Sequence, residues 1–181
     1  GKIQELRERK ELFRQGGGSD TVKRQHERGK LPARERLDLL LDPGSFREID
    51  LLVTPACSDF GMDKTWAPAD GVITGAGAID GRRVSVLAND FTVMGGSTGG
   101  EMGSGKSTRA QDYAYANGVP LVQLIDTGGG RPQEQHARYG YPGISHFVRH
   151  TRHSGAVPQI SLVMGPAVAG IAYGPALTDF I

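Results

Sequence analysis

Hydrophobic residues come in short runs along the second half of the chain, and glycine separates one run from the next. The runs cover residues 72–78, 84–88, 121–125 and 160–164. Their length and their boundaries are typical of buried β-strands. Residues 104–116 and 143–153 lie between the later runs and have helical composition. This alternation predicts an α/β fold, in which right-handed crossovers pack helices on a sheet.

The first 50 residues have a different, helical pattern. Residues 2–14 place apolar side chains near helical spacing among many charges, before the glycines at 16–18. A second helix is predicted to begin at Pro32 and Ala33 and to end at the turn residues 42–44. Its buried face is expected to consist of Leu37, Leu39, Leu40 and Leu41. We therefore expect an N-terminal helical arm, residues 1–50, followed by one domain, residues 51–181.

Composition narrows the functional class. The 181 residues suffice for one domain with a core, and the 27 glycines are expected at turns and ligand-facing loops. Lys and Arg total 21 against 20 acidic residues, which argues against nucleic acid as a partner. The single cysteine, Cys57, excludes internal disulfides and is typical of the cytoplasm. No apolar run is long enough to predict a membrane span.

Residues 100–107 read GEMGSGKS and match the P-loop pattern G-x-x-x-x-G-K-[ST]. In a P-loop the first glycine follows a buried strand, but here the glycine-rich residues 94–99 come first. A P-loop NTPase is therefore kept as the weaker alternative. In either case, backbone amides at a helix N-terminus, together with Lys106, suit a phosphate or a thioester oxygen.

Three histidines share one face of the predicted helix 143–153. His146, His150 and His153 stand at positions i, i+4 and i+7, a spacing that could hold a metal. Arg149 and Arg152 crowd the same stretch, and it contains no acidic residue. We therefore expect a solvated helix face and no metal site.

Two glycine-rich segments follow predicted strands. Residues 126–131 read DTGGGR and residues 165–170 read GPAVAG. Side by side, two such loops would offer converging backbone N–H groups, the requirement for stabilising a developing oxyanion. The same sequences also suit simple tight turns, and spacing alone leaves both interpretations open.

Several longer blocks resemble one family in order along nearly the whole chain. They are residues 29–37, 40–46, 59–62, 70–75, 89–97, 126–131, 158–166 and 176–180. In these blocks the chain resembles the carboxyltransferase β subunits of biotin-dependent acyl-CoA carboxylases, of the propionyl-CoA carboxylase type. The resemblance implies a crotonase-like (ClpP/crotonase) fold, present here in part.

The resemblance also implies a reaction and its residues. CO2 would pass from carboxybiotin, carried on a separate protein, to the α-carbon of an acyl-CoA thioester, with biotin itself as the base. The expected catalytic groups are the backbone amides of Gly128, Gly129, Ala169 and Gly170. The residues expected to bind coenzyme A are Lys106, Gly95, Gly96 and Arg131, with Lys106 as a partly exposed charge.

Departures from the family pattern limit this expectation. Ala169 stands where the family usually has glycine, which would narrow the pocket. The sequence stops at Ile181, before the family's C-terminal half, so the chain is expected to be incomplete as an enzyme. The expected partners are acyl-CoA, a biotin carboxylase or biotin carrier subunit, and further copies of the chain. The alternatives are a biotin-dependent decarboxylase subunit and a non-catalytic fragment or assembly subunit, and the acyl group is not specified.

Overall fold

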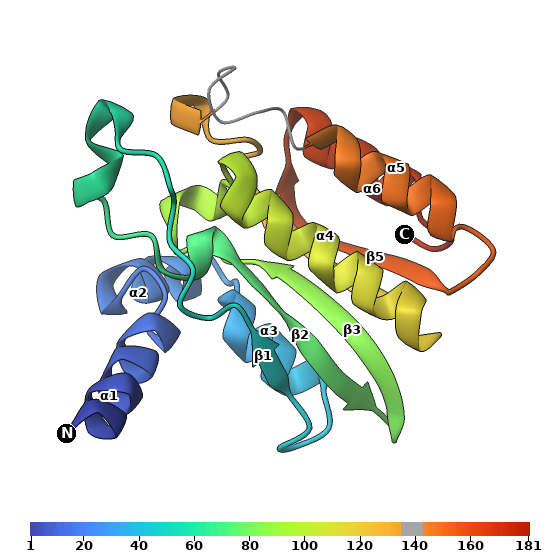
Figure 1. Ribbon diagram of the computed structural model, residues 1–181, viewed down its shortest axis with the longest axis horizontal. Helices are drawn as coiled ribbons and strands as arrows, with labels where there is room; N and C mark the ends of the chain where they lie inside the picture. The colour runs from blue at the N-terminus through green and yellow to red at the C-terminus, as the bar shows by residue number, and fades with distance from the viewer. Residues whose placement is uncertain (135–142) are drawn as a thin grey trace.

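The computed structural model describes residues 1–134 and 143–181 (Figure 1). Its helices are α1 (Lys2–Arg14), α2 (Ser19–Glu27), α3 (Ala33–Leu40), α4 (Gly100–Asn117), α5 (Gly143–His153) and α6 (Tyr173–Ala176). Its strands are β1 (Arg47–Ile49), β2 (Val72–Ile79), β3 (Arg82–Asn89), β4 (Leu121–Thr127) and β5 (Gln159–Ala167). The strands form one mixed sheet in the order β1-β2-β3-β4-β5.

The sheet combines an antiparallel half with a parallel half. Strands β1, β2 and β3 pair antiparallel, whereas β3, β4 and β5 pair parallel, with α4 and α5 as the connecting helices. The predicted α/β class is confirmed, and each predicted strand corresponds to an observed one. The hairpin between β2 and β3 and the short edge strand β1 were not predicted.

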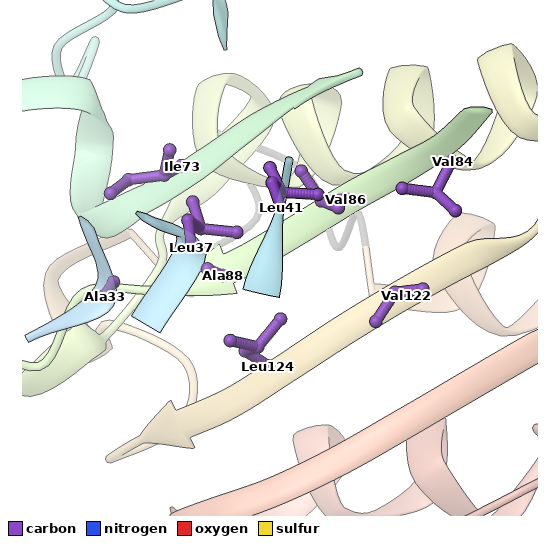
Figure 2. Packing of buried hydrophobic residues seen from close by; sticks show 9 residues of the cluster. All are labelled: Ala33, Leu37, Leu41, Ile73, Val84, Val86, Ala88, Val122 and Leu124. Atoms are coloured by element: carbon purple, nitrogen blue, oxygen red, sulfur yellow. The ribbon is translucent and has the colours of Figure 1, made fainter. Parts of the chain in front are cut away.

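Helices cover both faces of the sheet. Alternate residues of β3 point to opposite sides: Val86 joins the core beneath α3, whereas the hydroxyl of Ser85 donates to the carbonyl of Ala110 on α4. Figure 2 shows the cluster under α3, which is built from three residues of the arm and six of the sheet. Its buried members are Ala33, Leu37, Leu41, Ile73, Val84, Val86, Ala88, Val122 and Leu124.

The arm and the sheet therefore share one hydrophobic core. Helix α3 supplies core residues and β1 pairs with β2, although both lie within residues 1–50. The division of the chain at residue 50 stays a prediction. Helix α2, which was not predicted as a separate element, places Gln25 in a buried position next to the sheet.

A buried carboxylate ties the arm to strand β4 of the sheet. Asp126, on β4, has no exposed surface, and its Oδ2 accepts a hydrogen bond of 2.6 Å from Nη2 of Arg36 on α3. The Nε2 of Gln25 donates to the same oxygen at 3.3 Å, and Nζ of Lys30 lies 3.5 Å from Oδ1. A buried carboxylate is tolerated where a counter-charge and hydrogen bonds replace its water. The arm supplies both.

No helix in the described part of the chain is long and apolar enough to cross a membrane.

We predict that Arg36→Met destabilises the protein by about 3 kcal/mol or more, because it leaves a buried charge without its closest counter-charge. Chemical denaturation of the purified protein measures the loss. Arg14→Met is the control, since its pair with Glu11 is exposed and such pairs contribute about 1 kcal/mol at most. Equal losses in the two variants would contradict the proposed role of Asp126.

Candidate functional site

The two glycine-rich strand exits lie against each other. Strands β4 and β5 are parallel and neighbouring, so both loops leave the same edge of the sheet. After a register shift, Thr127 pairs with Ala167. A Cβ on Gly129 would lie 2.9 Å from the carbonyl oxygen of Val168, and Gly129 has a φ of +98°. Glycine is needed there because the second loop passes too close for a side chain.

In the first loop, two of the predicted donors already have acceptors within the chain. The amide of Gly128 donates to the carbonyl of Gly95 at 2.9 Å, and the amide of Gly129 donates to Oγ1 of Thr127 at 3.0 Å. A substrate oxygen would have to share or displace these bonds. In this conformation the bonds fix the shape of the first loop.

The Gly95 and Gly96 pair lies directly behind this loop. The hydroxyl of Thr127 donates to the carbonyl of Gly96 at 2.6 Å. A Cβ on Gly96 would lie 2.4 Å from the carbonyl oxygen of Asp126, and its φ is +66°. Gly96 is therefore required for close backbone packing, whereas a Cβ on Gly95 would meet no atom within 4 Å. The expected contact of both glycines with coenzyme A stays a prediction.

The second loop offers amides of a different kind. Residues Ala169–Ala172 form a short 3-10 helix, η6, in which the amide of Ile171 donates to the carbonyl of Val168 at 3.3 Å. The amides of Ala169 and Gly170 begin this helix, and a helix provides no acceptor for its own first N–H groups. Ala169 is exposed and has a φ of +53°, a costly conformation for alanine that is typical of functional loops.

Lys106 does not have the predicted exposure. Its side chain is fully buried, and its ammonium donates to the carbonyls of Ala69 at 2.8 Å and Val72 at 2.6 Å. The expectation of a partly exposed charge facing a phosphate is therefore wrong, because those two carbonyls occupy the ammonium inside the protein. Burial lowers the pKa of Lys106 to about 8.

Arg131 is buried as well. It is 1% exposed, and its Nη1 donates to Oδ1 of Asp70 at 2.6 Å and to Oε2 of Glu134 at 2.7 Å. The structure thus encloses a side chain that was expected to bind coenzyme A. Burial raises the pKa of Asp70 to about 6, and the Arg131 guanidinium opposes this rise. Asp70 had not been singled out as a site residue, although it opens one of the blocks that resemble the family.

The histidine face of α5 is buried, so the prediction of a solvated face is wrong. His150 has no exposed surface, and its Nδ1 lies 2.6 Å from Oε1 of Gln159. The Nδ1 of His146 lies 2.9 Å from Oε1 of Gln111 on α4. Burial lowers the pKa of His146 to about 3, so its ring is neutral near pH 7. Among the described residues, no group of three or more His, Cys, Asp or Glu side chains could hold a metal.

The P-loop alternative is contradicted by the position of its residues. Helix α4 begins at Gly100, so the whole segment 100–107 is helical and Lys106 lies well inside the helix. A P-loop instead wraps its glycine-rich backbone around the phosphates before the helix begins. The match to the pattern is therefore a coincidence of composition.

The carboxyl transferase domain model matches residues 24–181. The chain belongs to the carboxyl transferase domain family. It is 49% identical to the propionyl-CoA carboxylase beta chain of Cereibacter sphaeroides over 180 residues, which are 99% of this chain and 35% of that protein. It is 48% identical to the methylmalonyl-CoA decarboxylase subunit alpha of Propionigenium modestum over 181 residues, covering 99% of this chain and 34% of that subunit. The chain thus spans about a third of the length of these family members.

A solved member of the family has the same fold. The crystal structure of transcarboxylase 12S, described as a hexamer with methylmalonyl-coenzyme A and methylmalonic acid bound, has a TM-score of 0.94 and 43% identity to this chain. The match covers 99% of this chain and 35% of that structure. The predicted crotonase-like fold, present in part and preceded by a helical arm, is confirmed.

The lowered pKa of Lys106 predicts a pH effect on stability. Between about pH 8 and 10.5 the unfolded lysine keeps a proton that the folded lysine has lost, so stability rises with pH. Relative to Lys106→Met, the native protein should gain roughly 3 kcal/mol of unfolding free energy across this range. Denaturant unfolding at several pH values measures the difference.

Lys23→Met is the control for this experiment, because the Lys23 side chain is 77% exposed. It should leave the pH dependence of the native protein unchanged. A Lys106→Met variant whose stability follows the same pH curve as the native protein would contradict the burial of a charged Lys106.

Proposed function

We propose that this chain forms the acyl-CoA-binding part of a carboxyltransferase that moves a carboxyl group between biotin and the α-carbon of an acyl-CoA. The observation that carries the proposal is the pair of adjacent strand exits, where the amides of Ala169 and Gly170 begin a short helix. In a family of carboxyl transferases, such amides are suited to the thioester carbonyl oxygen.

Carboxyl transfer at the α-carbon requires hydrogen-bond donors from the protein. Removing or adding the carboxyl group at the α-carbon passes through an enolate, whose negative charge lies on the thioester oxygen. Amides fixed by the backbone stabilise this charge without having to reorganise during the reaction. The first loop forms the facing wall, since Gly129 touches the backbone of Val168.

The carboxylate of Glu134, which follows the first loop, is poorly suited to be the base. Glu134 is 2% exposed, and its carboxylate is paired with the Arg131 guanidinium inside the protein. This arrangement fits a reaction whose base arrives with the substrate. Biotin, when bound, would supply both the carboxyl group and that base.

The proposal also covers the direction of carboxyl transfer and the partners of the chain. The identity to a carboxylase chain, 49%, and to a decarboxylase subunit, 48%, is nearly the same, so both directions remain compatible with the chain. We infer an assembly of several copies with a separate biotin carrier, supported by the hexamer described for transcarboxylase 12S. The predicted cytoplasmic location rests on the single free cysteine.

The backbone amide of Gly170 is predicted to be required for rapid carboxyl transfer. In the native carboxyltransferase that contains this sequence, Gly170→Pro deletes the N–H and should lower kcat about a hundred- to a thousandfold. Carboxyl transfer to acyl-CoA, measured with the biotin carrier, tests this. Circular dichroism checks that the variant is folded, because proline also restrains the backbone.

Gly170→Ala is the matched control, because it keeps the amide. The added Cβ would lie 3.5 Å from Cζ of Phe147, an ordinary contact, so the loop has room for it. Activity should persist, with at most a changed preference for acyl size. A folded Gly170→Pro enzyme with normal turnover would show that this amide does not hold the oxyanion.

Coenzyme A, and not ATP, is the predicted ligand of the enzyme. The native enzyme should bind coenzyme A or a short acyl-CoA, and should show no tight, magnesium-dependent binding of ATP, because α4 lacks a phosphate-wrapping loop at residues 100–107. Isothermal titration calorimetry with acetyl-CoA and with Mg-ATP distinguishes the two. Tight Mg-ATP binding that is lost in Lys106→Met would overturn the proposal.

A further inference from the structure

Arg131 joins three segments that surround the first strand-exit loop. Besides its pairs with Asp70 and Glu134, its Nη2 donates to the carbonyl of Ser97 at 2.7 Å. Its backbone amide donates to the carbonyl of Thr98 at 2.8 Å. The side chain and the backbone of one residue thus fasten the loop to the segment that precedes α4.

Asp70 occupies a backbone conformation that needs support. Ala69 and Asp70 have φ values of +53° and +51°, so two consecutive residues other than glycine are left-handed, at a cost of about 1–2 kcal/mol each. The Lys106 ammonium donates to the carbonyls of Ala69 and Val72, on either side of Asp70. Lys106 therefore stabilises the turn that presents the carboxylate to Arg131.

Helix α4 closes the back of this arrangement. A Cβ on Gly103 would lie 2.7 Å from Oδ2 of Asp70, so the helix backbone lies directly on the carboxylate. Asp70 has no exposed surface. Because the carboxylate is enclosed by the protein, it depends on Arg131, and on the more distant Lys106, for its counter-charge.

We propose that Lys106, Asp70 and Arg131 form a positioning relay. Lys106 stabilises the turn at Ala69 and Asp70, and this turn positions the Asp70 carboxylate. The carboxylate, through Arg131, fixes the loop at Gly128 and Gly129. The relay contacts no substrate. It rests on the function proposed above, because it assigns the loop a fixed place opposite the amides of the second loop. All three side chains are occupied inside the protein.

Asp70→Asn tests the relay in the native enzyme. Asparagine tolerates a left-handed backbone and keeps an oxygen acceptor for Arg131, but it removes the charge. We expect kcat to fall roughly ten- to a hundredfold while KM for acyl-CoA stays nearly constant, because a displaced loop affects the transition state most. A purely structural role would lower thermal stability and leave kcat of the folded enzyme unchanged.

Hydrogen exchange provides a second measurement that is independent of activity. Mass spectrometry of a peptide covering residues 126–131 should show faster exchange in Asp70→Asn, since the amides of Gly128 and Gly129 lose their fixed acceptors. Arg131→Lys keeps the charge but cannot reach all three oxygens, so it should show the same acceleration. Should Arg131→Lys fail to fold, Asp70→Asn decides alone.

Asp50→Asn is the matched control. Asp50 also has a positive φ, of 60°, and pairs with an arginine of α4, Arg109, but the side chains of this pair are 27% and 53% exposed. Neither kcat nor loop exchange should change in it. A folded Asp70→Asn enzyme with native kcat or native loop exchange overturns the relay. A native enzyme without carboxyl-transfer activity would instead refute the proposed function, while the exchange result would still test the relay.

Discussion

The buried charges on either side of the first strand-exit loop must be neutralised from within the protein, and the position of this loop depends on that pairing. Asp126 precedes the first loop and is balanced by Arg36 from the arm. Arg131 closes the same loop and is balanced by Asp70 and Glu134. An unpaired charge in such a place would cost several kcal/mol, so each partner is held to a narrow range of positions.

This constraint explains why the residues with charged side chains lie behind the site, while backbone groups form its surface. An amide at a fixed position stabilises a developing negative charge without being titrated or rotated. The charged groups supply the rigidity that such an amide requires, and the cost of burying them is offset by mutual pairing. Ala169 and Asp70 both have a left-handed backbone, but Ala169 is exposed and Asp70 is buried.

The sequence predicted the positions of the strands better than the burial of individual side chains. Apolar runs bounded by glycine located β2, β3, β4 and β5, because the spacing of apolar residues and of glycines is a local property of the chain. Exposure was misjudged for Lys106 and for the face that carries His150, because burial of a polar side chain depends on a distant partner, such as Ala69 or Gln159. Spacing alone had left the adjacency of the two loops open, and the structure places them side by side because β4 and β5 are neighbouring parallel strands. Which amides already have acceptors could not be predicted, since the bond from Gly128 to Gly95 joins segments far apart in sequence.

The link between Arg36 and Asp126 also has a consequence for the order of events during synthesis. The two residues are 90 positions apart, and Gln25 lies 101 positions from the same carboxylate. Contacts this distant in sequence form late, because a long loop must close before they provide any stabilisation. The arm leaves the ribosome before the sheet does, yet it lacks its anchor until β4 has emerged. The arm is therefore made earlier than β4 but is fixed in place only after it.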